Sequence, residues 1–174
     1  MKINRIIVGR LRENCYILSK NEKVIVIDPG DEYEKIKEEI REKELIGILV
    51  THHHFDHVGA LPQLLEEYKV PLYDYETKEK EVIINPFTFE IIKTKGHTGD
   101  SVTFYFKEEN VMFTGDFLFK ESIGRTDLGG NIFDMKESIK KIKKYPNVTI
   151  YPGHGEKTTL NYEIKYNPYF HNFP

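Results

Sequence analysis

The amino-acid sequence predicts a single α/β domain in which helices cover β-sheets. Its 174 residues match the size of one ordinary domain. β-type and helical patterns alternate in both halves, without an internal repeat, a low-complexity segment or a linker rich in proline, glycine and serine. Polar clusters stand where predicted strands end. We therefore expect residues 1–174 to form one domain, with a functional site at a strand edge.

Short apolar, β-branched runs predict the strands of the first half. They cover residues 3–8, 15–19, 24–27 and 45–50. The third run ends at Asp28, Pro29 and Gly30, which stop a strand. Two helices are predicted over residues 32–42 and 61–68, because apolar side chains recur there at helical spacing.

The second half repeats these kinds of element. Strands are expected at residues 82–84, 87–92, 102–106, 111–113 and 148–151. A helix is expected over residues 134–145, where Met135, Ile139 and Ile142 share one face.

Composition and charge disfavour several classes of protein. Lys and Arg number 25 and Asp and Glu 28, so the net charge is −3, which argues against a nucleic-acid partner. Cys15 is the only cysteine, which excludes an intrachain disulfide and predicts a buried apolar role for it. No run approaches the about 18 apolar residues of a membrane helix, and the start lacks a signal-peptide core. We expect no membrane partner and a cytoplasmic location.

The segment from Thr51 to His57 carries the strongest chemical pattern. Its His-His-His-Phe-Asp-His run follows a predicted buried strand. Imidazole nitrogens and carboxylate oxygens are natural ligands for zinc, iron and manganese. His52 and His54 can point to the same side because strand side chains alternate, and Asp56 follows at the next turn. We interpret the segment as a metal site and not as a polar surface loop.

Three further segments follow other predicted strands and offer completing ligands. They are Gly96-His97-Thr98, Thr114-Gly115-Asp116 and Pro152-Gly153-His154-Gly155. Each alone would indicate only a cap or a turn. The histidine cluster already offers enough ligands to begin two adjacent metal sites, so we expect these segments to complete them.

This order of ligands resembles the signature of the metallo-β-lactamase superfamily. The matching residues are His52, His54, Asp56, His57, His97, Asp116 and His154. Within that family the chain is most similar to glyoxalase II and the short glyoxalase II-like hydrolases. Further matching segments are Val26-Ile27-Asp28-Pro29-Gly30, Ser122-Ile123-Gly124-Arg125-Thr126-Asp127, Thr158-Thr159-Leu160 and Asn167-Pro168-Tyr169. The resemblance covers nearly the whole chain.

The resemblance implies an αββα four-layer sandwich with two divalent metal ions at one edge, between the sheets. The ligands of the first ion would be His52, His54 and His97, those of the second Asp56, His57 and His154, and Asp116 would bridge the two. Zinc is the first expectation, with iron or manganese as alternatives.

Some other residues have expected roles outside the ligand set. His53 is expected near the ligands or in solvent without binding metal. Asp28 either supports the loop beneath the metals, as in the family, or forms the turn before Pro29. His171 is expected on the surface. The aromatic residues of the tail are expected to pack against the domain: Tyr162, Tyr166, Tyr169, Phe170 and Phe173.

The expected activity is hydrolysis of a small-molecule thioester or ester. Zinc lowers the pKa of its bound water to about 7, and two ions sharing Asp116 would hold a hydroxide that attacks the carbonyl carbon. Asp56 and Asp116 are the expected catalytic residues. A thioester suits this chemistry because a thiolate leaves without a strong general acid. No convincing triad with a serine or cysteine nucleophile is present.

Departures from glyoxalase II put glutathione recognition in question. The sequence ends 20 residues after His154, so the helical C-terminal domain that helps larger members hold glutathione is not expected. Arg125 and Asp127 stand where those members have a lysine and a tyrosine. Arg125 either binds an anionic substrate through its guanidinium or pairs with Asp127 or another acid. Gly99-Asp100-Ser101 stands where relatives often have a proline.

Two alternatives on the same fold stay open. A persulfide dioxygenase would use a single iron held by His52, His97 and Asp116, whereas an intact set of seven ligands favours two metals and hydrolysis. A lactonase would use the same hydroxide on an ester carbonyl. The oligomeric state is left open.

Overall fold

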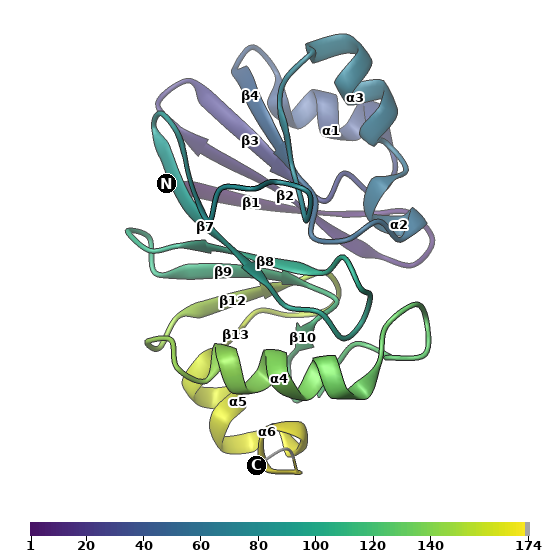
Figure 1. Cartoon of the computed structure of the whole chain (residues 1–174). Helices are drawn as coiled ribbons and strands as arrows, with labels where there is room; N and C mark the ends of the chain where they lie inside the picture. Colours follow the sequence, from purple (N-terminus) through teal and green to yellow (C-terminus); the bar gives the residue numbers. More distant parts are fainter. Residues whose placement is uncertain (173–174) are drawn as a thin grey trace.

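The computed structural model of the protein describes residues 1–172 and consists of four layers (Figure 1). Two helices cover one sheet, and three lie on the far side of the other. These covering helices are α1 (Tyr33–Ile40), α3 (Leu61–Tyr68), α4 (Ile132–Ile142), α5 (Leu160–Tyr166) and α6 (Pro168–Asn172). The αββα sandwich expected from the resemblance is confirmed. Phe173, part of the predicted aromatic tail, lies outside the described residues.

The first sheet joins an antiparallel half to a parallel half. Its strand order is β1-β2-β3-β4-β5. The bounds in that order are Lys2–Val8, Glu13–Lys20, Lys23–Ile27, Glu44–Leu49 and Leu72–Tyr73. The first three strands pair antiparallel through short hairpins. β3, β4 and β5 pair in parallel, because α1 and α3 provide the crossover connections.

The second sheet has the strand order β13-β12-β9-β8-β7-β6. The bounds in that order are Thr158–Thr159, Thr149–Pro152, Val111–Gly115, Val102–Phe106, Phe87–Lys93 and Glu81–Ile84. β6 to β9 form an antiparallel meander, and β12 returns parallel to β9 after α4. A small ribbon of β10 (Leu118–Phe119) and β11 (Ser122–Ile123) follows β9.

Side chains that alternate along the strands divide the core into three regions. The region between the sheets is rich in aromatic rings. The Phe89 ring lies 5.8 Å from that of Phe104 and 5.3 Å from that of Phe106, between ring centroids. Ile36 of α1 packs on the outer face of the first sheet, and Ile139 of α4 packs on the outer face of the second. The helix faces predicted from periodicity are therefore the buried ones.

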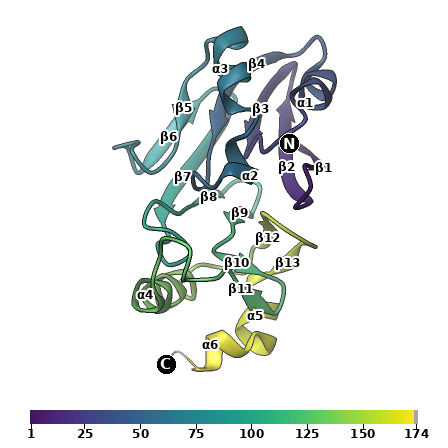
Figure 2. The same cartoon turned by 90° about the vertical axis from the view of Figure 1, so that its right-hand side faces the viewer.

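The strand ends that carry polar clusters lie at one edge of the sandwich. β8 runs antiparallel to both β7 and β9, so β7, β9 and β12 end at the same edge of the second sheet. β3 and β4 end together in the first sheet. Backbone hydrogen bonds join the two edges, from Val102 N–H to the Thr51 carbonyl (2.8 Å) and from Asn14 N–H to the Gly153 carbonyl (2.7 Å). Figure 2 faces the side of the molecule on which α2 (Phe55–Val58), just after β4, lies.

Helix bounds differ from the predicted ones because of the caps. α1 is shorter than residues 32–42, since Glu32 and Arg41 at its two ends have φ of 52° and 54° and leave the helical conformation. α4 begins earlier than residue 134, because the Asn131 side chain accepts a hydrogen bond from Asp134 N–H at 2.8 Å. The shortest elements, such as the two-residue β5, β10, β11 and β13, are too short to give a periodic pattern and were missed.

The aromatic residues of the tail pack against the domain only in part, whereas all of them were predicted to do so. Phe170 is buried against the outer face of the second sheet, together with Leu160. Tyr166 is mostly exposed, with its ring 4.7 Å from that of Tyr162. Among residues 1–172, no helix is long and apolar enough to cross a membrane.

Candidate metal centre

All seven predicted ligands converge at the edge where the two sheets meet. The contributing segments are the loop after β4 (His52, His54), α2 (Asp56, His57), and the loops after β7 (His97), β9 (Asp116) and β12 (His154). Six of the seven form two groups of three, and in each group the ligand atoms lie within 4.8 Å of one another. Four parts of the chain that are far apart in sequence thus bring their donor atoms to one place, since the loop after β4 continues directly into α2.

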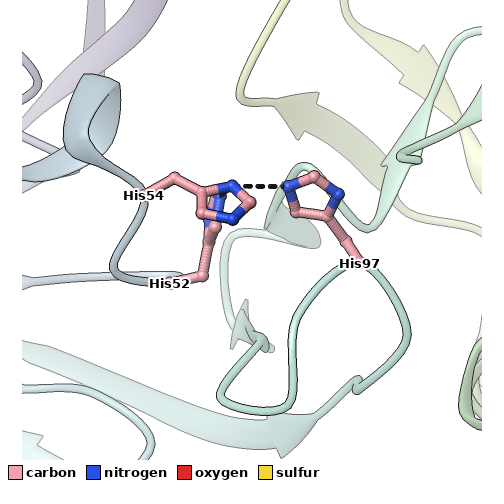
Figure 3. Close-up of side chains that lie close together, drawn as sticks. All are labelled: His52, His54 and His97. Atoms are coloured by element: carbon pink, nitrogen blue, oxygen red, sulfur yellow. Dashed lines mark hydrogen bonds between the residues drawn. The ribbon is translucent and has the colours of Figure 1, made fainter. Parts of the chain in front are cut away.

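The first group consists of His52, His54 and His97. His54 Nδ1 lies 3.2 Å from His52 Nε2 and 2.9 Å from His97 Nε2. Figure 3 shows the His97 ring reaching from its own loop toward His54, with His52 beside it. Three ring nitrogens therefore point at one small volume.

Backbone carbonyls determine which nitrogen of two of these histidines faces inward. His97 Nδ1 donates to the carbonyl of Arg125 at 2.6 Å, and His54 Nε2 donates to the carbonyl of Leu128 at 3.0 Å. In the neutral form each imidazole carries one N–H, which these carbonyls take up, so the inner nitrogens, His97 Nε2 and His54 Nδ1, then carry lone pairs. Their 2.9 Å approach then brings two lone pairs together.

A series of hydrogen bonds between side chains orients His52. Thr51 Oγ1 donates its proton to Asp28 Oδ2 at 2.6 Å, so it accepts from His52 Nδ1 at 3.1 Å. His52 Nε2 is therefore the third unprotonated nitrogen of the group. A cation among three converging lone pairs would remove their repulsion, so the chemistry of this group fits a metal ion.

The second group consists of Asp56, His57 and His154. Asp56 Oδ2 lies 3.2 Å from His154 Nε2 and 3.8 Å from His57 Nε2. His57 Nδ1 donates to Asp28 Oδ2 at 2.9 Å, which leaves His57 Nε2 as the nitrogen that faces the group.

Asp116 lies between the two groups. Its Oδ1 is 3.3 Å from His57 Nε2, and its Oδ2 is 3.6 Å from both His97 Nε2 and His154 Nε2. His57 Nε2 and Asp116 Oδ1 are buried, and neither makes a hydrogen bond to any of the described residues. The two oxygens of this carboxylate thus face ligands of both groups, as those of a bridging residue would.

The electrostatics of the centre prepare its ligands for a cation. Burial and the neighbouring imidazoles hold the pKa of His52 far below its usual value, and burial also lowers the pKa of His97. Burial opposes the charged form of His57, but the carboxylates of Asp116 and Asp28 outweigh it and raise the pKa of His57. Two histidines of the first group, His52 and His97, are thus kept neutral, while the carboxylates draw positive charge into the centre.

Asp28 performs both of the roles left open for it. Its φ of 50° forms the turn after β3. Its buried carboxylate also accepts hydrogen bonds from Thr51 N–H (2.7 Å), from Thr51 Oγ1 (2.6 Å) and from His57 Nδ1 (2.9 Å). Asp28 therefore ties the loop after β4 and the helix α2 to the end of β3.

Residues at the start of β2 hold the loop that carries His154, and sequence reasoning missed them. Asn14 Nδ2 donates to the carbonyls of Pro152 (3.0 Å) and Gly155 (2.9 Å). The Tyr16 hydroxyl donates to the Pro152 carbonyl at 2.6 Å. These contacts span more than 130 residues of sequence, and no local pattern signals them.

Glu13, which is buried close to the second group, was also missed by sequence reasoning. Neither of its oxygens makes a hydrogen bond to the described residues, and Oε1 lies 3.8 Å from His57 Nδ1. Burial raises the pKa of this carboxyl well above its usual range. The predicted strand began only at Cys15, so Glu13 lay outside every predicted element. Cys15 itself is buried and free, as predicted.

His53 points away from the two groups. Its Nδ1 lies 2.7 Å from Asp100 Oδ2, and its Nε2 lies 3.4 Å from Asp74 Oδ2. These contacts agree with the expectation that His53 is no ligand. His171 is exposed, with its Nε2 3.0 Å from the Lys165 carbonyl.

The Arg125 side chain makes the internal pair that was one of its two expected roles. Its Nε donates to Asp127 Oδ1 at 3.0 Å and its Nη2 to Asp127 Oδ2 at 2.7 Å, with both side chains exposed. Arg125 also lines the cavity at the centre. Its part in substrate binding stays a prediction.

A cavity of about 580 Å³ opens onto both groups. Its polar lining comes from His54, Asp56, His97, Asp116, Arg125 and His154, and its remaining lining from Leu11, Phe55, Phe119, Gly124 and Leu128. Ligands of both groups therefore face a space of the size of a small-molecule site.

The residues present fit divalent metal ions. Imidazoles and carboxylates are the donors that zinc, iron and manganese share. Buried polar atoms without hydrogen bonds are destabilising, and two of them, His57 Nε2 and Asp116 Oδ1, face each other inside the centre. A metal ion would satisfy both.

Comparison with known proteins identifies the family. The family model described as the Metallo-beta-lactamase superfamily matches residues 8–83 and 76–154. The chain belongs to the metallo-β-lactamase superfamily. Divalent metals are the cofactors of this superfamily, in agreement with the His and Asp groups described above.

Two relatives within the metallo-β-lactamase superfamily match over their whole length. The probable metallo-hydrolase YqgX of Bacillus subtilis is 34% identical, with 99% of each chain covered. The hydroxyacylglutathione hydrolase GloC of Haemophilus influenzae is 31% identical, again with 99% of each chain covered.

Solved structures of the superfamily share the fold. The BLEG-1 B3 metallo-beta-lactamase superposes with a TM-score of 0.92 at 30% identity, covering 97% of this chain and 99% of that one. TTHA1623 in a di-iron-bound form superposes with a TM-score of 0.85 at 32% identity, covering 95% and 99%. ETHE1 from Myxococcus xanthus gives a TM-score of 0.86 at 23% identity, covering 97% and 84%, and shows the shared fold alone.

Proposed function

We propose that the protein is a metal-dependent hydrolase of the glyoxalase II type, which cleaves a thioester with two divalent ions in its centre. The observation that carries the proposal is the position of Asp116. Its two oxygens lie 3.3 Å from His57 Nε2 and 3.6 Å from His97 Nε2, so one carboxylate faces both ligand groups.

The proposal assigns all seven ligands. The first ion would be held by His52, His54 and His97, the second by Asp56, His57 and His154, with Asp116 shared. Zinc is the first choice, and the di-iron form of TTHA1623 supports iron as an alternative. The name of the GloC relative supports an acylthiol substrate, at an identity of 31%.

The bound ions would supply an activated water, whose pKa zinc lowers to about 7, and positive charge for the developing oxyanion. The protein supplies the placement. The Arg125 and Leu128 carbonyls lock the rings of His97 and His54, so these ligands need not reorganise during the reaction.

Asp56 and Asp116 would be the catalytic carboxylates. Both line the cavity, and their Oδ2 atoms lie 3.2 Å and 3.6 Å from His154 Nε2. A carboxylate at this position can accept a proton from a water that attacks a carbonyl carbon. Among the described residues that line the cavity there is no serine, threonine or cysteine, which favours attack by water over a covalent enzyme intermediate.

Two alternatives would use the same pocket. A lactonase would apply the same chemistry to a cyclic ester. A persulfide dioxygenase with one iron on His52, His97 and Asp116 would give Asp56 and His154 no role, although their atoms converge at 3.2 Å. The convergence of the second group therefore favours the two-metal hydrolase.

A hydrolysis assay tests the proposal. The protein as purified should release free thiol from S-lactoylglutathione or from a simpler thioester, lose this activity after chelation and regain it with zinc, iron or manganese. Oxygen consumption with a persulfide, without any release of thiol from a thioester, would contradict the hydrolase and favour the dioxygenase.

A further inference from the structure

Large apolar side chains surround the mouth of the cavity. Leu11, Phe55 and Leu128 line it although they are 54%, 75% and 46% exposed. Phe119 lines it beside His154, with ring centroids 6.2 Å apart. Single exposed apolar residues are common, but a cluster around one opening marks a binding surface.

The four side chains come from separate parts of the fold. Leu11 lies in the turn between β1 and β2, Phe55 begins α2, Phe119 belongs to β10, and Leu128 lies in the loop between β11 and α4. Two of these segments adjoin strands of the first sheet and two belong to the stretch between β9 and α4, so the apolar surface does not belong to one loop.

The cationic side chain at the mouth, that of Arg125, is already paired with a carboxylate. Arg125 supplies the only guanidinium or ammonium group among the described residues that line the cavity. It is held by Asp127 through two parallel hydrogen bonds of 3.0 Å and 2.7 Å. A charge-paired fork attracts an anionic substrate less than a free one does.

The apolar surface lies next to the proposed metal ligands. The Leu128 carbonyl accepts from His54 Nε2 at 3.0 Å, so the same residue that orients this ring presents its side chain to the cavity. Phe55 is joined directly to Asp56, and Phe119 faces His154. A substrate bound by these apolar side chains would have its carbonyl beside the carboxylates.

We infer that the substrate of this centre carries an uncharged, apolar acyl group, which Leu11, Phe55, Phe119 and Leu128 bind. The inference rests on the proposed function and gives its substrate class. A polar acyl group such as lactoyl would then gain little from this surface.

A chain-length series tests the inference. The substrates are N-acetylcysteamine thioesters of acetyl, butanoyl, hexanoyl and octanoyl groups, compared with S-lactoylglutathione. We expect kcat/KM to rise about threefold per added methylene, because each is transferred from water to apolar surface, and to exceed the value for S-lactoylglutathione at hexanoyl.

Matched variants show whether the rise belongs to this surface. Phe55→Ser and Leu128→Ser should flatten the dependence on chain length, whereas Phe133→Ser, which removes a phenylalanine as exposed as Phe55 at 75% but outside the cavity, should keep it. Metal content and melting temperature are measured on each variant, so that a change in kcat/KM can be assigned to substrate binding and not to loss of metal or of fold.

Binding of uncharged alkyl amides, measured by calorimetry, gives a readout without turnover. Affinity should rise with chain length, with a negative heat-capacity change, and both effects should fall in Phe55→Ser and Leu128→Ser. Thioester hydrolysis with a flat chain-length series, or with S-lactoylglutathione preferred, would overturn the inference and keep the hydrolase. No hydrolysis of any thioester or ester, with alkyl amides still bound, would overturn the proposed function and keep the apolar site.

Discussion

Asp116 Oδ1 lies 3.3 Å from His57 Nε2, and neither atom makes a hydrogen bond to the described residues although both are buried. On the far side of its ring, His57 donates Nδ1–H to Asp28, so the inner nitrogen of a neutral His57 carries a lone pair. A carboxylate oxygen and an imidazole lone pair repel each other unless a proton or a cation lies between them. Because the carboxylates raise the pKa of His57, a proton can fill this place when no metal is bound, and a divalent ion would replace it.

Asp116→Ala removes the residue that faces both ligand groups. We expect the metal content to fall by at least one ion per chain and kcat/KM to fall about 100-fold or more, since both charge neutralisation and ligand placement are lost. Elemental analysis and the thioester assay measure the two effects. Glu137→Ala, on the exposed surface of α4, is the control. Unchanged activity in Asp116→Ala would contradict the shared-carboxylate arrangement.

Asp28→Asn separates the support of the ligands from the formation of the turn. Asparagine tolerates the positive φ of 50° at this position, so the turn survives. Its amide can replace only one of the two oxygens, which leaves a donor from Thr51 or His57 without an acceptor. We expect a loss of about 2 kcal/mol in the free energy of unfolding and weaker metal binding. If urea unfolding and metal titration give the same values for Asp28→Asn as for the unaltered protein, Asp28 serves only to form the turn.

Gly153→Ala tests how closely the second group is packed. A Cβ at Gly153 would lie 2.4 Å from Asp116 Oδ1 and 2.6 Å from His57 Cε1, closer than real side chains approach. We expect this variant to fold but to lose one ion per chain. Gly99→Ala is the matched control, because its nearest neighbouring atom would be 3.9 Å away. Full metal occupancy in Gly153→Ala would show that the loop after β12 moves freely.

Arg125→Ala distinguishes the two roles expected of this side chain. Because the guanidinium is held by Asp127, we expect KM to change by the same factor for an anionic thioester and for a neutral one. Asp127→Ala should reproduce the effect, since it breaks the same pair. A rise in KM confined to the anionic substrate would assign Arg125 to substrate binding and would argue against an apolar acyl group.

The core of the centre could be predicted from the sequence because its chemistry is local. His52, His54, Asp56 and His57 stand within six residues after a buried strand, and His97, Asp116 and His154 each lie within four residues of a strand end. Strand ends therefore indicated a shared site, while the division of the seven residues into two ligand groups came from the resemblance. The order of layers followed from the resemblance and agrees with the buried helix faces.

The surroundings of the centre could not be predicted in the same way. Glu13, Asn14 and Tyr16 act on the loop of His154 through contacts that depend on how the two sheets meet. Leu11 and Phe55 are ordinary apolar residues in sequence, and only the fold places them beside one cavity. The Arg125 pair was one of two open roles, since sequence spacing alone does not determine the direction of a long side chain.

Removal of metal should destabilise the fold as well as abolish activity. An ion that binds only the folded state adds about 2.7 kcal/mol of stability when its free concentration is 100 times Kd. Chelated protein should therefore melt at a lower temperature than metal-loaded protein. The difference should shrink in Asp116→Ala and persist in Glu137→Ala. Equal melting curves with and without chelator would show that the described groups bind no metal.

The metal content per chain of protein purified without added metal is the most direct test of the two-metal centre. Two divalent ions per chain are expected, because two separate groups of three ligand atoms flank Asp116. Their number should fall when either group is altered, for example by His97→Ala or His154→Ala. A single iron per chain that survives His154→Ala would contradict the two-metal hydrolase and leave His52, His97 and Asp116 as the ligands of a mononuclear centre.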